Sequence, residues 1–418
     1  MNSLEALDLA FSPREEIDDP ERYAGRLHEL AQGVSALNSR GSLLVIHGAR
    51  GVGKSSLARQ LRLLASGDTR LQQTHASSAD LTVYHNRRPY FIKCPSPTAD
   101  TPALLAKVRR AVADDIPASY RDGPTGSDTR RFGVFPKGVG FGKDRATDRQ
   151  DPAMMRLNAP EDEILIDVLK RHHRRYKCPA LIVMDDIDSM TDMAGMAHFL
   201  MSVDPEHAQF ILVGVAATAD SLLDDYESIR RLLRPIEVST MSRQDLEEIF
   251  QIARKRMDAT GLTLTYAPSV VDLILTEAVG MPYIVQALAR DAGQKCLELS
   301  SSVVTEEHLS RVVLDLTGST SWQMCEQAYR KAVGRSGQRA DVLHICSTHE
   351  GDVAISAIAS AAKQHYSHTN PYQVVEQLTT GVDSVLIKVP GSDGFVRFRD
   401  PILKWYTRRR VSSDVQVD

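Results

Sequence analysis

The sequence predicts an α/β fold: a parallel sheet with helices on both faces, followed by an all-α region and a smaller domain in which helices precede a hairpin. Over the first 240 residues, short apolar runs alternate with longer segments of helical periodicity, which is typical of a parallel sheet covered on both sides. After residue 240 the strand signals stop, and they return only near residue 385. We therefore expect a core at residues 1–240, a helical lid at 241–318 and a winged-helix domain at 319–418.

Five apolar runs in the first region are expected to be strands. Each is short and bounded by glycine, proline or polar residues, as in strands that are buried inside a sheet. Helical periodicity separates them, for example at 102–113 and at 161–175, where His172-His173-Arg174-Arg175 is expected to be the exposed helix end. The expected strands are 43–47, 90–93, 180–184, 210–215 and 235–238.

The region after residue 240 opens with a helix-start signal. Ser242 and Asp245 form a capping box, and Leu246, Ile249 and Phe250 then share one helical face. Turn residues near 390–394 predict a hairpin between two short strands. The further expected helices are 268–279, 283–298, about 305–317, 319–333, 339–348, 352–366, 371–379 and one from 400 onward, and the expected hairpin strands are 385–389 and 395–398.

Composition places the chain among ordinary globular proteins. Hydrophobic residues make up 42% and charged residues 25% of 418, which excludes a wholly disordered chain and a fibre. No run approaches the roughly 18 apolar residues of a membrane helix, the start lacks a signal-peptide pattern, and the five cysteines have no metal-ligand spacing. We therefore expect a cytoplasmic protein. The net charge of −4 excludes a basic coat protein, but not a local basic patch.

A glycine-rich turn follows the first expected strand. Its sequence, GARGVGKS at residues 48–55, matches G-x-x-x-x-G-K-[ST], the Walker A motif or P-loop. Glycines let backbone N–H groups cradle phosphates, and the following helix points its positive end at them. Lys54 is expected to reach the β- and γ-phosphates of ATP, and the Ser55 hydroxyl to hold Mg²⁺. The expected nucleotide-binding residues of this P-loop NTPase core are Gly48, Gly51, Val52, Gly53, Lys54, Ser55 and Ser56.

A second motif is an apolar strand that ends in two acids. LIVMDD at residues 181–186 is typical of a Walker B motif. Asp185 is expected to hold Mg²⁺, directly or through water. Asp186 is expected to orient the attacking water, because phosphoryl transfer depends chiefly on positioning and charge neutralisation. The alternative is an exposed acidic turn after a strand.

Two shorter segments complete a family pattern: YAGRLHEL at residues 23–30 and GMP at 280–282. With the two motifs above, they resemble AAA+ ATPases, close to the clade of origin-recognition initiators, archaeal-type bacterial ATPases and STAND signalling ATPases. The resemblance covers about residues 13–317. It implies that the backbone at Gly25 and Arg26 helps to bind adenine, and that Pro282 starts a lid helix near the nucleotide.

The same resemblance implies catalytic residues outside the two motifs. Thr218 occupies the place of a polar sensor residue that contacts the γ-phosphate or the water. Arg231 and Arg234 lie in an arginine-bearing box, from which an arginine can reach the γ-phosphate on a neighbouring subunit of an ATP-bound homo-oligomer; a guanidinium suits this role because it is always charged and bidentate. A solvated helix end is the alternative for these arginines.

Two departures from the family pattern bear on activity. Active AAA+ motors usually carry Glu where this chain has Asp186, which favours slow ATP hydrolysis and a switch-like role. Initiators usually carry an arginine shortly after the lid G-x-P, whereas the nearest one here is Arg290, two turns further on.

Three hypotheses concern the target of this ATPase. The first is a DNA-acting switch, since a winged helix commonly docks a helix in the major groove and the insertion at 121–150 carries a net charge of +3. Against it, the expected recognition helix at 370–380 has no Lys or Arg, and residues 319–418 carry only about +2. The second is a STAND-like signalling or defence switch that binds a partner protein, and the third is a chaperone-like remodeller. The candidate DNA contacts are Lys388, Arg397, Arg399, Arg408, Arg409 and Arg410.

Overall fold

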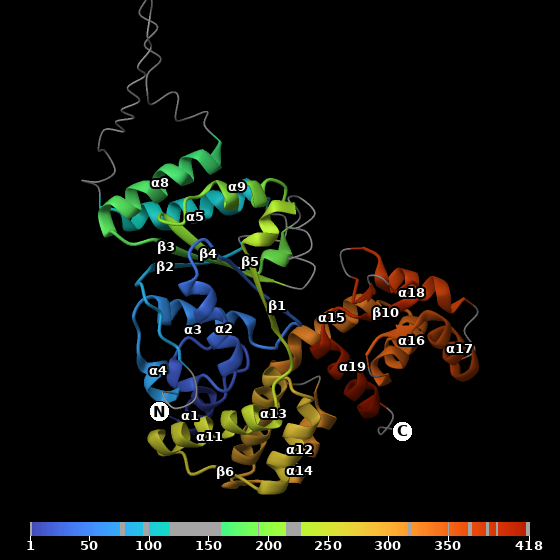
Figure 1. The fold of residues 1–418 in the computed structure, drawn as a ribbon. Helices are drawn as coiled ribbons and strands as arrows, with labels where there is room; N and C mark the ends of the chain where they lie inside the picture. Colours follow the sequence, from blue (N-terminus) through green and yellow to red (C-terminus); the bar gives the residue numbers. More distant parts are fainter. Residues whose placement is uncertain are drawn as a thin grey trace, which may run out of the picture.

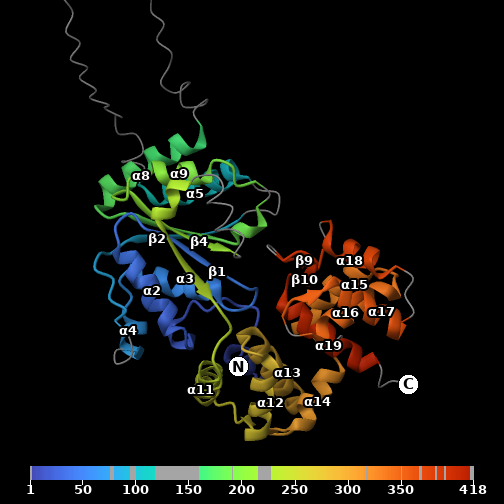
Figure 2. The ribbon, with the colours of Figure 1, turned by 45° about the vertical axis from the view of Figure 1, so that its right-hand side comes forward.

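The computed structural model has three parts: an α/β core, a helical lid below it and a C-terminal domain beside both (Figures 1 and 2). Among the described residues, it contains no helix with the length and apolar character needed to span a bilayer. The structure describes residues 2–75, 80–94, 100–117, 160–190, 192–214, 227–316, 319–349, 351–366, 370–381, 384–389 and 392–414.

The core contains a five-stranded sheet in the order β2-β3-β4-β1-β5, with every pair parallel. The predicted parallel sheet is therefore confirmed. Three strands, β2, β4 and β5, begin two residues earlier than expected, and Pro89 and Pro235 lie inside the first and the last of them. Both are on edge strands, where a missing N–H is tolerated. The strands are β1 Leu43–Gly48, β2 Arg88–Lys93, β3 Ala180–Asp185, β4 Ala208–Gly214 and β5 Leu233–Val238.

Helices cover both faces of this sheet (Figure 1). Alternate residues of β1 point to opposite sides: Leu44 and Ile46 pack with α2 and α3, whereas Leu43 and Val45 pack with α5, α8 and α9. This arrangement explains why the central strands are apolar throughout. The helices and 3₁₀ turns of the core are η1 Pro20–Arg22, α2 Leu27–Asn38, α3 Lys54–Ala65, α4 Arg70–His75, α5 Thr101–Asp115, α8 Glu161–Tyr176, η2 Ile187–Ser189, α9 Met196–Ser202 and η3 Glu227–Arg231.

The expectation of an exposed helix end at residues 172–175 is wrong for His172. Its side chain is fully buried, and its ring lies 5.6 Å from that of Tyr90 and 4.9 Å from that of Tyr176. The polar residue type concealed this position, because the helix turns His172 toward the sheet while Arg174 and Arg175 are exposed.

The described part of the lid contains four helices, and the first begins at the predicted capping box, in which Ser242 and Asp245 bond reciprocally. An unpredicted helix, α1 Ser3–Ala10, packs on the lid helices α11 and α13 rather than on the sheet. The ring of Phe11 then lies 5.6 Å from Phe250 and 5.7 Å from Tyr266. The lid elements are α11 Arg243–Thr260, β6 Thr265–Tyr266, α12 Pro268–Ala278, α13 Pro282–Glu298, β7 Val303–Val304 and α14 Glu306–Leu314, with β6 and β7 paired in parallel.

The C-terminal domain combines helices with a small antiparallel sheet of order β8-β10-β9. Sequence periodicity missed β8, because two residues are too few for a strand signal. Trp322 and Trp405 stack at 4.6 Å in its core. Its elements are η4 Thr320–Trp322, α15 Gln323–Val333, α16 Gly337–Thr348, β8 Val353–Ala354, α17 Ile355–Tyr366, α18 Pro371–Thr379, β9 Leu386–Lys388, β10 Phe395–Phe398 and α19 Pro401–Asp414.

Candidate functional site

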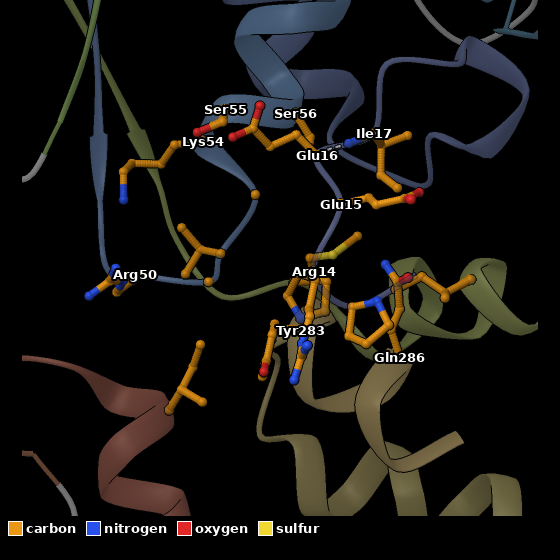
Figure 3. Close-up of a pocket in the computed structure, with 18 of the residues that line it drawn as sticks. Arg14, Glu15, Glu16, Ile17, Arg50, Lys54, Ser55, Ser56, Tyr283 and Gln286 are labelled. Carbon is orange, nitrogen blue, oxygen red and sulfur yellow. Dashed lines mark hydrogen bonds between the residues drawn. The ribbon is translucent and has the colours of Figure 1, made fainter. Parts of the chain in front are cut away.

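A cavity of about 630 Å³ lies where the core, the lid and the C-terminal domain meet. The P-loop forms one wall, and the segment before η1 forms a second (Figure 3). The start of α13 contributes from the lid, and α15 and α19 contribute from the C-terminal domain. The predicted phosphate-binding motif therefore opens into a cavity large enough for a small ligand.

The backbone of the P-loop needs glycine at two positions for different reasons. Gly48 ends β1 so close to β5 that a Cβ there would lie 2.3 Å from the Val238 carbonyl oxygen. Gly51 has a φ of 78°, in the left-handed region that favours glycine. Val52 is buried beneath the loop, and Gly53 is the N-cap of α3. The loop thus reaches the helix start with its backbone facing the cavity.

Lys54 and Ser55 occupy the first turn of α3. The Lys54 Nζ donates to the carbonyl oxygens of Gly48 and Ala49, at 3.0 and 2.9 Å. Burial lowers the pKa of Lys54, and nearby aspartates, Asp188 first, oppose this shift. The Ser55 hydroxyl donates to Asp185 Oδ1 at 3.1 Å. The two predicted motifs, 130 residues apart in sequence, therefore meet in the structure.

Asp185 is the residue that best fits a metal ion. It is fully buried at the end of β3, and its Oδ2 has no hydrogen-bond partner among the described residues. Burial and, to a lesser extent, the neighbouring Asp186 carboxylate together raise the pKa of Asp185 to about 6. A buried carboxylate oxygen without a partner, beside a hydroxyl, suits Mg²⁺, which keeps several waters and takes few protein ligands.

Asp186 follows with a φ of 59° and lines the cavity. Its backbone N–H donates to Asp185 Oδ1 at 3.0 Å, which fixes the direction of the turn. The left-handed backbone turns Asp186 away from the path of the strand. The two carboxylates are thus separated: one is buried beside Ser55, and the other faces the open space where a reacting group could sit.

The Gly25-Arg26 segment is tied to the P-loop. The buried Arg26 guanidinium donates to the Val52 carbonyl oxygen at 3.0 Å and to the Ser239 carbonyl, and it pairs with Glu29 at 2.7 Å. The Gly25 N–H donates to Glu248 of the lid at 2.8 Å. The Arg26 side chain thus holds this segment against the P-loop, and the Gly25 N–H holds it against the lid.

Ser56 and the segment before η1 hold each other in place. The Ser56 Oγ accepts a hydrogen bond from the Ile17 N–H at 3.0 Å, and Gln60 donates to the Ile17 carbonyl at 2.8 Å. Glu16 pairs with Arg59 and Lys93. Ser56 therefore lines the cavity, but its hydroxyl is engaged by the chain itself. Sequence patterns did not identify this segment as part of the site.

On the lid side, Pro282 begins α13 and lines the cavity together with Tyr283 and Gln286. Arg290 does not reach it. That guanidinium pairs with Asp8 of α1 at 2.7 Å. The lid therefore supplies a helix start to the cavity, as expected for Pro282, without an arginine.

Of the remaining catalytic candidates, the described Arg231 and Arg234 do not line the cavity. Thr218 lies outside the described residues. Arg231 and Arg234 are exposed at the start of β5. There Leu233 pairs with the first residue of β1, whereas the P-loop follows its last residue. The two arginines thus lie at the opposite end of the strands from the cavity of their own chain.

Residues 22–213 match the family model described as "AAA ATPase domain". This region is an AAA ATPase domain. The predicted AAA+ resemblance is confirmed for this region. The comparison with curated proteins found no match.

Several solved structures are similar to the whole chain. One is the Aeropyrum pernix ORC1 protein in complex with DNA. The two are 14% identical, the match covers 99% of this chain and 98% of that chain, and the TM-score is 0.47. The ORC2 protein of the same organism, in ADPNP-ADP complexes, has 13% identity, 97% and 99% coverage and a TM-score of 0.47. A STAND protein with a tetratricopeptide repeat sensor from Pyrococcus horikoshii has 13% identity, 98% and 47% coverage and a TM-score of 0.38. At such identities the likeness extends no further than the fold.

The C-terminal domain closes the cavity of the AAA ATPase domain, which no sequence signal indicated. Ile402 of α19 packs on the P-loop: a Cβ at Gly51 would lie 2.4 Å from the Ile402 Cδ1. Asp400, just before α19, lies 3.9 Å from the Arg50 guanidinium. Met324 of α15 is also part of this wall. A domain that is distant in sequence is thus in direct contact with the phosphate-binding loop.

Most candidate DNA contacts have partners within the chain. The basic insertion at 121–150 lies outside the described residues, and Arg408 is exposed on α19. The other five candidates pair with acids or with a hydroxyl of the lid and the C-terminal domain. Arg409 pairs with Glu277, Arg410 with buried Glu326 at 2.9 Å, Lys388 with Glu376 at 3.0 Å and Arg397 with Asp352 at 3.9 Å, and Arg399 donates to Ser384 Oγ at 2.7 Å.

Proposed function

We propose that this protein is an ATP-dependent switch, in which the nucleotide state of the AAA ATPase domain controls the position of the C-terminal domain. The observation that carries the proposal is the contact between Ile402 and the P-loop at Gly51. A ligand in the cavity lies between parts of the chain that the structure brings together there. Binding can shift their arrangement only by its differential affinity for the two states.

The residues for nucleotide binding follow from the cavity. Lys54 and the N–H groups of the P-loop face the phosphates. Ser55 and Asp185 hold Mg²⁺, because their oxygen atoms lie 3.1 Å apart and one carboxylate oxygen is unpartnered. The bound ion supplies charge neutralisation of the phosphates. The backbone at Gly25 and Arg26 lies beside the adenine, with Pro282 on the lid side.

The residues for hydrolysis are divided between two subunits in this proposal. Asp186 orients the water from within the same cavity, and Thr218 contacts the γ-phosphate or that water. Arg231 or Arg234 of a neighbouring copy completes the site, since both lie far from the cavity of their own chain. A shorter carboxylate at position 186 favours slow turnover in an ATP-bound homo-oligomer.

The ion pair between Arg50 and Asp400 determines whether ATP tightens or loosens the contact between the C-terminal domain and the P-loop. Arg50 is the partner of Asp400 and also part of the P-loop. Phosphates bound to the loop compete with Asp400 for Arg50, and they repel its carboxylate. ATP therefore loosens the contact between α19 and the P-loop, which frees the C-terminal domain for its target.

The first candidate target is duplex DNA, bound by a winged-helix C-terminal domain through Arg397, Arg399 and the basic tail. The second is a partner protein, and the pairing of Arg409 with Glu277 and of Arg410 with Glu326 favours it, because paired guanidinium groups neutralise few phosphates. Salt-sensitive retention on a duplex column supports DNA. Retention that changes neither with salt concentration nor when Arg397, Arg399 and Arg408 are replaced excludes DNA binding through these residues.

Lys54→Ala tests the nucleotide part of the proposal. We expect the variant to lose MgATP binding in isothermal titration calorimetry, because the lysine lies on the loop that faces the phosphates. Lys170→Ala, which removes an exposed lysine on α8, is the matched control and is expected to bind as the unmodified chain does. Full binding by Lys54→Ala would place the nucleotide elsewhere.

A further inference from the structure

Arg14 lies in the segment between α1 and η1, and its side chain lines the cavity (Figure 3). It is near Tyr283 at the start of α13, where its charge opposes the rise of the phenol pKa that burial causes. Neither sequence motif includes this residue. A ligand bound in this cavity would therefore lie within reach of a guanidinium group that the sequence motifs do not account for.

The segment that carries Arg14 is fixed on both sides. On the lid side, the Ser12 N–H donates to Gln286 Oε1 at 2.9 Å. On the core side, the Ile17 N–H donates to Ser56 Oγ at 3.0 Å. Arg14 therefore starts from an anchored backbone between the lid and the P-loop helix, which limits where its guanidinium can reach.

The other cations in the cavity show why Arg14 is different. In the part of the chain that the structure describes, six lysine or arginine residues line the cavity. Four of them pair with a carboxylate: Arg22 with Glu15, Arg26 with Glu29, Arg50 with Asp400 and Lys93 with Glu16. Among the described residues, Arg14 has neither an ion pair within 4.0 Å nor a side-chain hydrogen bond, and Lys54 has no ion pair at that distance.

We propose that Arg14 contacts the phosphates of the bound nucleotide from the lid side, opposite Lys54. This inference rests on the proposed function. A guanidinium without a carboxylate partner, facing a cavity that is built around a P-loop, matches a polyphosphate in charge. In the absence of a lid arginine at the cavity, Arg14 provides the positive charge on that side.

Arg14→Ala, Arg14→Lys and a control, Arg40→Ala, test this. Arg40 is 72% exposed and lies outside the cavity. In calorimetric titrations with MgATP, we expect Arg14→Ala to weaken binding about ten- to a hundredfold. Arg14→Lys keeps the charge and stays within about fivefold of the unmodified chain, and Arg40→Ala is unchanged. The melting temperature of the nucleotide-free protein does not change, because Arg14 holds no partner in it.

Other outcomes overturn the inference. MgATP affinity within about twofold of the unmodified chain in Arg14→Ala, with binding lost in Lys54→Ala, removes Arg14 from the site and leaves the proposed function intact. Equal losses of MgATP affinity in Arg14→Ala and Arg14→Lys would mean that the positive charge at position 14 does not contribute to binding, which contradicts the inference. A lowered melting temperature without nucleotide would indicate a structural role. Absence of ATP binding by the unmodified chain refutes the proposed function itself.

Discussion

Replacing Asp400 by asparagine removes one negative charge from the wall that the C-terminal domain presents to the P-loop. The Asp400 Oδ1 accepts a hydrogen bond from the Ile402 N–H at 2.8 Å, at the start of α19. Asparagine is as good a residue as aspartate for such a helix start. The variant therefore keeps the local structure and isolates the effect of the charge on the nucleotide site.

The structure sets the size of the expected effect. Asp400 and Arg50 lie 3.9 Å apart, and the Arg50 side chain is 70% exposed, so the ion pair contributes at most about 1 kcal/mol. A nucleotide phosphate near Arg50 meets a repulsion of similar size from the Asp400 carboxylate. Removing both the ion pair and the repulsion should make the free energy of MgATP binding more favourable by about 1–2 kcal/mol, which corresponds to an about five- to thirtyfold lower Kd.

The assay is calorimetric titration with MgATP at low and high ionic strength, with Asp393→Asn as control. Asp393 is exposed near β10, outside the cavity. Asp400→Asn should bind more tightly, and the gain should shrink at about 0.5 M salt, because salt screens exposed charges. An unchanged or weaker affinity, with an unchanged melting temperature, refutes the charge competition between Asp400 and the nucleotide.

Three further predictions concern other parts of the chain. Asp186→Asn should bind MgATP normally but lose turnover about a hundredfold in a phosphate-release assay, because it cannot orient the water as a carboxylate does; unchanged turnover contradicts its role. Gly51→Ala should lower both the melting temperature and MgATP affinity, since the added Cβ meets Ile402 at 2.4 Å and the backbone φ is 78°; wild-type values would show that α19 does not rest on the loop. Burial lowers the pKa of His172 from 6.5 to about 4; the Asp115 charge opposes this shift, and the charges of Arg88 and His173 add to it. The folded state therefore favours the neutral ring, and the free energy of unfolding falls by about 3 kcal/mol as the pH falls from 6.5 to 4. His172→Leu should flatten this dependence in urea titrations, whereas loss of exposed His85 should not; an equally steep curve in His172→Leu contradicts this.

The parts of the fold that were predictable depend on local signals. The central strands are apolar throughout because helices cover both faces of the sheet, and such runs are visible in a sequence. The partnership of Ser55 and Asp185 was also accessible, since the two motifs follow strands whose carboxyl ends meet at one edge of a parallel sheet. The capping box at Ser242 placed the start of the lid in the same way.

The rest depends on contacts between residues far apart in the chain. Nothing in the residues around Ile402 indicates that it rests on Gly51, some 350 positions earlier. A charge count of the basic tail likewise could not show that Arg409 and Arg410 have partners in Glu277 and Glu326. These contacts arise from domain packing, which periodicity and motif spacing do not encode.

Hydrogen exchange at the start of α19, with and without MgATP, tests the central claim most directly. In the structure, the Ile402 N–H bonds to Asp400 while the Ile402 side chain packs on the P-loop. If ATP loosens this contact, deuterium uptake in a peptide spanning residues 399–405 rises on addition of MgATP, and does not rise in Lys54→Ala. Unchanged or slower exchange in the ATP-bound chain would contradict an ATP-driven release of the C-terminal domain.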